Sequence, residues 1–319
     1  MYALFDMDRL PDWILLLVLP FKILYYFLEA LIFAVIPDIL RKKESFFGKI
    51  VVITGGGNGI GRCLALRLGK LGVKVVIWDI DLTQAEVVKT EILNAGGEAY
   101  AYRCDISDRY EVCRVADLVR KDIGDPFGLI NNAGIVNGMT IMELPDERIE
   151  NLFRVNALAS FWTVKAFLPH MLNQNSGHIV TISSVAGYAG ICKMGDYCGS
   201  KAAMNSFHET LTLEILASGK PGVCTTLVCP YLVHTGLFQG AKSRFPRLIP
   251  VVEPDYLAER IVRSMQLKER HLILPAVMRF LLPVYRVLPR KVLESSDDIF
   301  GMYSCMDEFQ STSYSHSIP

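Results

Sequence analysis

The sequence lacks the cysteine and histidine patterns that hold structural metals. Its eight cysteines include no Cys-x-x-Cys pair, and its six histidines show no zinc spacing. It also has no Asn-x-Ser/Thr acceptor site for N-glycosylation. These absences argue against a zinc-stabilised module and favour reduced thiols in a cytosolic compartment.

An excess of charge of either sign is missing as well. The 319 residues include 33 basic and 33 acidic side chains, for a formal net charge of +0. No basic block is longer than the run Arg41–Lys43, so nucleic acid is not an expected partner. Whole-chain disorder is also disfavoured, because apolar residues make up 51% of the chain and can build a large core.

Residues 13–36 form a long hydrophobic stretch, WILLLVLPFKILYYFLEALIFAVI. As one helix it would be about 36 Å long, enough to cross a bilayer. However, Pro20 interrupts the stretch, and Lys22 and Glu29 lie inside it, each at a cost of roughly 2.5–3.5 kcal/mol in the bilayer centre. A helix starting at Phe21 would be about 24 Å long, which is short for a crossing. We therefore favour a monotopic anchor or hairpin over a single span, and a buried soluble helix stays as a third interpretation.

The flanks of this stretch do not resemble those of a cleaved signal peptide. Acidic residues surround a lone Arg9, and no small-residue cleavage site follows. The run Arg41–Lys43 comes directly after the apolar residues, and by the positive-inside rule it stays in the cytosol with everything after it. We expect residues 1–45 to be an N-terminal hydrophobic membrane anchor.

From residue 49 onward the sequence alternates between strand and helix patterns. The first run, KIVVIT, is apolar and β-branched, as is typical of a strand buried on both faces. The segments between such runs have helical spacing, which predicts an α/β fold with a doubly wound parallel sheet and right-handed crossovers. Seven runs are predicted strands: 49–54, 73–79, 98–105, 127–134, 177–184, 223–230 and 271–275.

A glycine-rich turn, TGGGNGIG (54–61), follows the first strand. Its glycines allow a tight turn and the close approach of a phosphate, and the next helix presents its N-terminus to that anion. Glycine clusters also mark plain turns, but this one lies between a strand and a helix, as dinucleotide binding requires. The sequence therefore predicts a dinucleotide site.

Asp79 ends the second strand, 18 residues after Gly61. A carboxylate at this point can accept hydrogen bonds from the adenosine ribose hydroxyls and repel a 2′-phosphate. Asn58 brings no compensating positive charge, and Arg62 is expected on the helix surface. We therefore expect NAD rather than NADP as the cofactor.

Tyr197 and Lys201 lie four residues apart in GDYCGSKAAM, so a helix would place them on one face. They are either a surface pair or a proton-transfer device, because a nearby cation lowers the pKa of a phenol.

Four motifs in order resemble those of the short-chain dehydrogenase/reductases: TGxxxGxG (54–61), NNAG (131–134), Ser184 and YxxxK (197–201). The resemblance covers residues 46–275 and implies a single Rossmann-type domain. The chain is most similar to membrane-associated retinol dehydrogenases of the epidermal type, with the lipid-droplet 17β-hydroxysteroid dehydrogenases as near relatives. The segments that carry this likeness are LEALIFAVIP (28–37), WDI (78–80), FWTVKAFLPHML (161–172), DYCGSKAA (196–203) and TTLVCPYLVHTGLF (225–238).

The resemblance implies hydride transfer between NAD and a hydrophobic alcohol or carbonyl, first of all retinol and retinal. A 17β-hydroxysteroid or long-chain alcohol is the alternative substrate, and a non-catalytic lipid-surface scaffold is a remote alternative function. In the family's mechanism Tyr197 transfers the proton, Lys201 favours the phenolate and holds the nicotinamide ribose, and Ser184 binds the substrate oxygen. Strand alternation assigns the neighbouring Ser183 to structure.

The resemblance also implies that Asn156 holds a water of the proton relay. The alternative is that Asn156 only produces a kink in a helix. Asp105 matches the adenine contact of the family, and the alternative is a cap for the next helix. The cofactor contacts implied by the resemblance are Thr54, Gly55, Asn58, Gly59, Ile60, Gly61, Asp79, Asp105, Ile106, Asn132, Ala133, Gly134, Tyr197, Lys201 and Thr235.

Two later segments are expected near the substrate and the membrane. Residues 236–252 form an apolar loop that commonly covers the substrate in this fold. Residues 276–293 mix apolar and basic side chains as an interfacial segment does, with helices broken at Pro283 and Pro289. We expect 276–319 to be a C-terminal membrane-proximal segment that ends in a mobile polar tail.

These expectations together give a location and a set of partners. The partners are a small hydrophobic alcohol or carbonyl and membrane lipid, and a homodimer is left open. The expected location is the endoplasmic reticulum membrane or the lipid-droplet surface, with the catalytic domain facing the cytosol.

Overall fold

The computed structural model describes residues 11–35, 41 and 43–309. The chain divides into two compact units, residues 1–44 and 45–319. The first unit contains α1 (Asp12–Val35), which continues through Pro20. The expected interruption at this proline is therefore wrong, because the loss of one helical hydrogen bond does not end the helix here. Among the described residues, no helix combines the length and the apolar character that a membrane crossing needs.

The second unit is built on a seven-stranded sheet in the order β3-β2-β1-β4-β5-β6-β7. All its strand pairs are parallel, which confirms the doubly wound α/β prediction. The chain order reverses between β1 and β4, so a crevice for ligands is expected beyond the carboxyl ends of these two strands. The strands are β1 (Ile50–Thr54), β2 (Lys74–Asp79), β3 (Glu98–Arg103), β4 (Gly128–Asn131), β5 (Gly177–Ile182), β6 (Val223–Pro230) and β7 (His271–Leu274).

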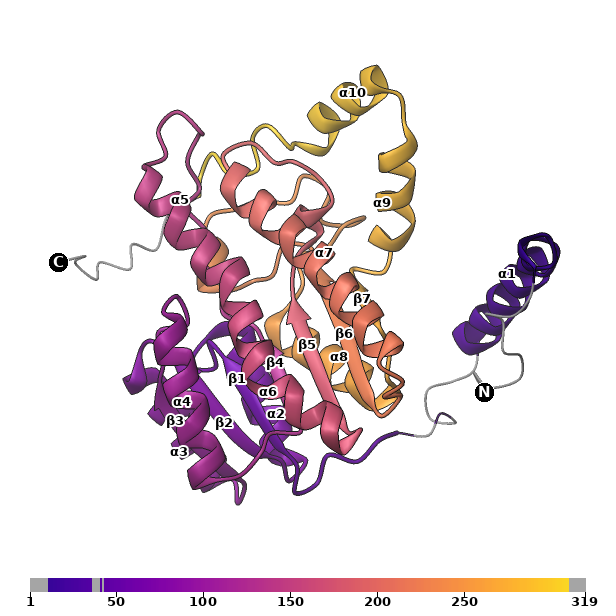
Figure 1. The fold of residues 1–319 in the computed structure, drawn as a ribbon. Coiled ribbons are helices and arrows are strands. Elements are labelled where there is room, and N and C mark those ends of the chain that lie inside the picture. The colour runs from indigo at the N-terminus through magenta and orange to yellow at the C-terminus, as the bar shows by residue number, and fades with distance from the viewer. Residues whose placement is uncertain (1–10, 36–40, 42, 310–319) are drawn as a thin grey trace. The chain divides into compact units, whose positions relative to one another are not determined.

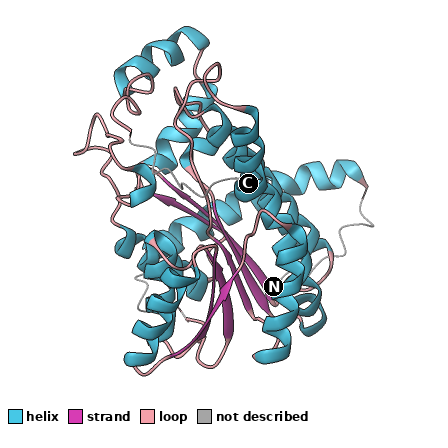
Figure 2. Ribbon diagram, turned by 90° about the vertical axis from the view of Figure 1, so that its left-hand side faces the viewer, coloured by secondary structure: helices cyan, strands magenta, loops and turns pink. Residues whose placement is uncertain are grey.

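Helices cover both faces of the sheet (Figure 2). Val51 and Ile53 of β1 belong to one hydrophobic core, while Val52 between them belongs to the other. This alternation explains why the strands are continuously apolar rather than half polar. The first core lies under α2 (Gly59–Lys70), α3 (Leu82–Asn94) and α8 (Pro254–Leu267), and the second under α4 (Arg109–Asp122), α6 (Ala159–Gln174) and α7 (Gly195–Ala217).

Thr54 ties together the turns that follow β1 and β4. Its Oγ1 accepts hydrogen bonds from the backbone N–H groups of Asn132 (3.0 Å) and Ala133 (3.1 Å). In return, Asn132 Nδ2 donates to the carbonyl oxygens of Thr54 and Gly55, both at 2.9 Å. The two sides of the crevice are therefore one hydrogen-bonded unit.

Further helices lie beyond the carboxyl ends of the strands: α5 (Asp146–Phe153), α9 (Met278–Val287) and α10 (Arg290–Phe300) (Figure 1). Pro289 separates α9 from α10 as expected, but Pro283 lies inside α9, so the expected break there is wrong. Residues 301–309 continue across the same end of the domain, and 310–319, the rest of the expected polar tail, lie outside the described residues.

We predict that Thr54→Val destabilises the domain by roughly 1–3 kcal/mol, because valine keeps the shape but leaves two backbone donors without their acceptor. The shift of the midpoint in urea unfolding measures this loss. Thr83→Val, at an exposed position of α3, is the matched control and should change stability by less than about 0.5 kcal/mol. Equal shifts in the two variants would contradict a special role for Thr54.

Candidate active site

The glycine-rich turn has the shape that a bound pyrophosphate requires. Gly55 and Gly59 have φ angles of +62° and +52°, in the left-handed region that favours glycine. A Cβ atom at Gly61 would overlap the carbonyl oxygen of Gly55, so only glycine fits there. Asn58 caps α2 by accepting a hydrogen bond from the N–H of Gly59 (2.7 Å), and Ile60 packs against the core behind the turn. The turn therefore presents a helix N-terminus without an obstructing side chain.

Asp79 closes the adenosine side of this turn. Its Oδ2 accepts a hydrogen bond from the N–H of Gly57 (2.9 Å), and its Oδ1 accepts one from the N–H of Asp81 (3.0 Å). Burial raises the pKa of the Asp79 carboxyl, and these backbone hydrogen bonds oppose the rise. Arg62 pairs with Glu91 of α3 (2.6 Å) and so lies on the helix surface as expected.

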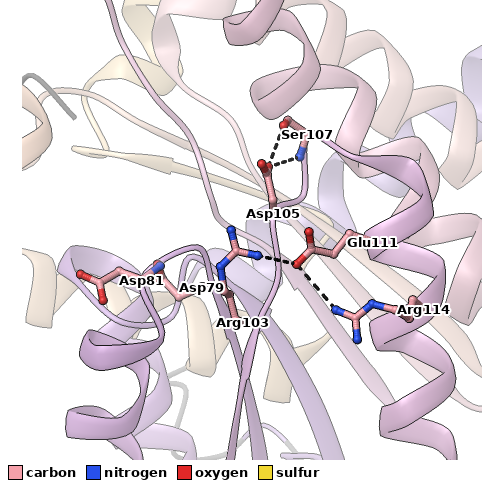
Figure 3. Close-up of polar contacts among 7 residues, drawn as sticks. All are labelled: Asp79, Asp81, Arg103, Asp105, Ser107, Glu111 and Arg114. Atoms are coloured by element: carbon pink, nitrogen blue, oxygen red, sulfur yellow. Dashed lines mark hydrogen bonds and ion pairs between the residues drawn. The ribbon is translucent and has the colours of Figure 1, made fainter. Parts of the chain in front are cut away.

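Asp105 lies past the end of β3, beside the Asp79 corner (Figure 3). Its Oδ1 accepts hydrogen bonds from the backbone N–H (2.9 Å) and hydroxyl (2.7 Å) of Ser107. The cap of α4 is Asp108 instead, so the interpretation of Asp105 as that cap is wrong. Ile106 is buried between these residues and the core.

The NNAG segment links the glycine-rich turn to Asn156 and Lys201. Ala133 packs directly against Gly55, where an added Cβ would come 2.9 Å from the Ala133 Cα. A Cβ at Gly134 would lie 3.3 Å from Asn156 Oδ1 and 3.6 Å from Lys201 Nζ. The small residues of this segment therefore leave room between the two halves of the site.

Thr235 approaches the same turn from the other side. It follows β6 and precedes a short 3₁₀ helix, Gly236–Phe238. A Cβ at Gly59 would lie 3.6 Å from Thr235 Cγ2, so this threonine faces the glycine-rich turn. Residues far apart in the sequence thus meet at one crevice.

Tyr197 and Lys201 are buried rather than a surface pair, with exposed fractions of 4% and 5%. Lys201 Nζ lies 5.5 Å from the centre of the Tyr197 ring and donates a hydrogen bond to the Ile182 carbonyl (3.0 Å) at the end of β5. Ser184 lies beyond the same strand, where its Oγ donates to the Pro230 carbonyl (3.3 Å) and is in hydrogen-bond contact with Tyr197.

The neighbouring Ser183 donates instead to the backbone carbonyl of Lys201 (3.2 Å) and is structural, as strand alternation predicted.

Asn156 lies in a π-helical turn, Arg154–Leu158, between α5 and α6. Its Oδ1 accepts from the N–H of Ile135 (2.8 Å), and its Nδ2 donates to the Ile135 carbonyl (2.9 Å) and to Ser200 Oγ (3.2 Å). π turns inside helices are frequent at functional sites. The two interpretations of Asn156 are thus not exclusive, since the irregular turn is what directs its amide at the segment beside Lys201.

A family model of the short chain dehydrogenases matches residues 49–244. The chain belongs to the short-chain dehydrogenase/reductase family. This confirms the family predicted from the four motifs.

Curated relatives in this family share about two fifths of their residues with the chain. Epidermal retinol dehydrogenase 2 of Homo sapiens is 41% identical over 289 residues, which cover 90% of this chain and 93% of the relative. Short-chain dehydrogenase/reductase family 16C member 6 of Bos taurus is 40% identical, with 88% of each chain covered. Estradiol 17-beta-dehydrogenase 11 of Mus musculus is 37% identical, with 90% and 94% covered.

Solved structures of the family share the fold. A short-chain dehydrogenase/reductase from Burkholderia phymatum in complex with NAD is 27% identical, with a TM-score of 0.70 over 79% of this chain and 96% of that one. A metagenomic short-chain oxidoreductase in complex with NADP is 29% identical, with a TM-score of 0.62 over 72% and 98%.

In this dehydrogenase, burial sets the charge states of Tyr197 and Lys201. Desolvation raises the pKa of the Tyr197 phenol well above its ordinary value, although the hydrogen bond with Ser184 opposes the rise. Desolvation also lowers the pKa of Lys201 to about 8. The phenol is therefore neutral at pH 7 and can donate its proton to a carbonyl, while proton removal from an alcohol needs further positive charge beside Tyr197.

An apolar cover lies over Tyr197. The ring of Phe238, from the expected substrate loop, packs edge-on against the Tyr197 ring at a centroid distance of 5.6 Å. Met306 is 4% exposed and belongs to the same hydrophobic cluster as Tyr197.

Residues 302–309, which we call the C-terminal strap, hold this cover in place. The Met302 carbonyl accepts from the N–H of Cys192 (3.1 Å), and the Cys305 carbonyl from the N–H of Lys242 (3.2 Å). Ion pairs join Asp307 to Lys193 and Glu308 to Lys242, both at 2.6 Å.

The strap was missed in the sequence, where this end of the chain was predicted to be a mobile polar tail. A signal was nevertheless present. The apolar residues Met302, Cys305, Met306 and Phe309 recur at helical spacing inside a polar segment.

We predict that Tyr197→Phe lowers kcat by about 10³-fold or more, because general acid–base catalysis contributes on this scale and phenylalanine keeps only the ring. Affinity for NAD should stay within a factor of about two, as measured by calorimetry. Tyr102→Phe is the matched control, since it removes from β3 a phenol hydroxyl that donates to Asp122 of α4 (3.2 Å). Substantial turnover by Tyr197→Phe would refute the proton-transfer role.

Proposed function

We propose that this protein is an NAD-dependent dehydrogenase of retinol or a similarly hydrophobic alcohol, acting at a membrane surface. The observation that carries the proposal is the buried Tyr197–Lys201 pair with Ser184, placed beneath an apolar cover and joined to a dinucleotide turn. The retinol and estradiol dehydrogenases among the relatives support the substrate class. A 17β-hydroxysteroid is the second candidate substrate.

The residues present fit NAD. The glycine-rich turn leaves space that a Cβ would fill, and Asp79 offers a carboxylate where the adenosine ribose would lie. When bound, NAD supplies the hydride acceptor and, in its oxidised form, a positive charge near the phenol. Thr235 and Lys201 would hold the nicotinamide end, and the glycine turn the pyrophosphate.

Side chains of the protein itself bind the substrate oxygen and transfer the proton of its hydroxyl group. Ser184 holds the substrate oxygen by a hydrogen bond, and Tyr197 exchanges the hydroxyl proton with it. Lys201 stabilises the phenolate from behind, and Asn156 would hold a water that passes the proton to solvent. Phe238 and Met306 exclude other water and present an apolar wall to the substrate.

Turnover of a small substrate panel tests the activity. Full-length protein in detergent micelles with NAD should convert all-trans-retinol to retinal, detected by chromatography, with Tyr197→Phe as the blank. Estradiol and a long-chain primary alcohol serve as competing substrates. Faster conversion of estradiol would shift the substrate to the steroid class, and no conversion of any of the three would overturn the dehydrogenase proposal.

Membrane attachment is supported by two apolar surfaces, each within its own unit. In α1, Trp13, Leu16 and Phe21 have exposed fractions of 63%, 69% and 74%. In α9, Phe280, Val284 and Val287 are exposed by 76%, 54% and 81% at positions i, i+4 and i+7, while Met278 and Leu282 are buried. Exposed arginines, Arg279 and Arg286, flank the α9 stripe, as expected for a helix lying on anionic lipid.

We place the protein at the endoplasmic reticulum membrane or the lipid-droplet surface, with the catalytic domain in the cytosol. The basic run Arg41–Lys43 and the missing glycosylation acceptors support this orientation, although Lys42 lies outside the described residues. For a homodimer, exposed apolar side chains are available at Leu158 in the π-helical turn, Phe161 of α6 and Leu213 of α7.

We predict that replacing Phe280, Val284 and Val287 by serine lowers the binding of a chain without residues 1–44 to anionic vesicles by about tenfold or more, because the stripe supplies its apolar contact. Vesicle co-sedimentation measures this binding. Replacing the exposed Val87 and Leu93 of α3 by serine is the control and should change nothing. Equal binding of the stripe variant and its parent would contradict a membrane role for α9.

A further inference from the structure

A cation ends the strand next to the one that ends in Asp79, the carboxylate expected to exclude a 2′-phosphate. Asp79 and Arg103 are register partners at the ends of the parallel strands β2 and β3, so their side chains start on the same face of the sheet. The Arg103 side chain is 56% exposed. Among the described residues its ion pair is with Glu111 and not with Asp79. Figure 3 shows the guanidinium of Arg103 turned toward Glu111 and joined to its carboxylate.

Glu111 holds this guanidinium. Arg103 Nη1 donates to Glu111 Oε1 (3.1 Å), and Arg114 Nη2 lies 3.8 Å from the same oxygen. The Glu111 side chain is only 16% exposed and lies in the first turn of α4, where the helix dipole favours a negative charge. The carboxylate is therefore the fixed member of the pair, and the guanidinium is a long, exposed group anchored to it.

An arginine in this position matters because guanidinium groups bind phosphate in a bidentate manner. A ribose held by Asp79 would lie at the ends of two neighbouring strands, about 5 Å apart, that carry Asp79 and Arg103. If Arg103 were unpaired, its charge would offset the repulsion that Asp79 provides. Selectivity for NAD therefore requires that Arg103 be ion-paired as well as that Asp79 be present.

We propose that Glu111 is a second determinant of NAD selectivity, which acts by keeping Arg103 ion-paired and unavailable to a 2′-phosphate. This inference rests on the proposed function, since it concerns the same dinucleotide site. Glu111 is a positioning residue that acts through Arg103. Asp79 and Glu111 then reject NADP by different means, one by repulsion and the other by sequestering the cation.

Binding of ADP-ribose and 2′-phospho-ADP-ribose to the full-length protein in micelles tests this without turnover. Glu111→Gln should raise the affinity for 2′-phospho-ADP-ribose by about tenfold, the size of effect that one freed charge pair can supply, and change that for ADP-ribose by less than about twofold. Adding Arg103→Leu should abolish the gain. Arg114→Leu is the matched control, because Arg114 contacts the same oxygen from α4, and its affinity ratio should equal that of the wild type.

Asp79→Ala provides a route that leaves Glu111 in place. This variant should gain affinity for 2′-phospho-ADP-ribose through the loss of repulsion alone, and adding Arg103→Leu should leave that gain unchanged, because Glu111 still holds the guanidinium. An unchanged ratio in Glu111→Gln, a gain in Glu111→Gln that survives Arg103→Leu, or a gain in Asp79→Ala that Arg103→Leu removes would overturn the proposal. Failure of the wild type to bind ADP-ribose would instead overturn the dinucleotide site itself and the proposed function with it.

Discussion

The buried ammonium of Lys201 is the constraint on which the rest of the site depends. Removing a charge from water is costly, and the structure offsets this with a hydrogen bond to the Ile182 carbonyl at the end of β5. That bond requires α7 to begin at a fixed point, which Asp196 secures by accepting from the Tyr197 N–H (2.8 Å) and from Asn137 Nδ2 (2.6 Å). The position of the phenol follows from this arrangement, because it lies one turn away on the same helix.

The two ends of the cofactor crevice are coupled through small groups rather than large ones. The hydroxyl of Thr54 and the amide of Asn132 join the β1 and β4 turns, and Gly134 leaves the space between Asn156 and Lys201. Asp79 and the Tyr197–Lys201 pair are therefore both positioned by the carboxyl ends of the parallel strands. This is why residues of the glycine turn and of α7 keep a fixed separation although more than 130 positions divide them in the sequence.

The sequence predicted those parts of the structure whose cause is local. The strands were found because both of their faces are buried, and the turn at 54–61 because its glycines have no other common use between a strand and a helix. Helix breaks were predicted at Pro20 and Pro283 because each proline removes a backbone hydrogen bond. The remaining helical hydrogen bonds keep both helices continuous. The apolar spacing of the strap was visible in the sequence, but it does not reveal what the strap covers, because Met306 shares its cluster with Tyr197 and Phe238, which lie far away along the chain. The Arg103–Glu111 pair likewise depends on how β3 meets α4.

The cover over Tyr197 also has a consequence for the order of folding. Asp307 and Lys193 close a loop of 114 residues, whereas α7 and its contacts with the 3₁₀ turn at Val185–Gly187 are local. Contacts that close long loops form after local ones, because the chain entropy must be lost before they stabilise anything. We therefore expect the strap to dock on a sheet that is already assembled. Since burial is what raises the pKa of Tyr197, we expect the acid strength of the site to depend on long-range packing as well as on the helix that carries the tyrosine.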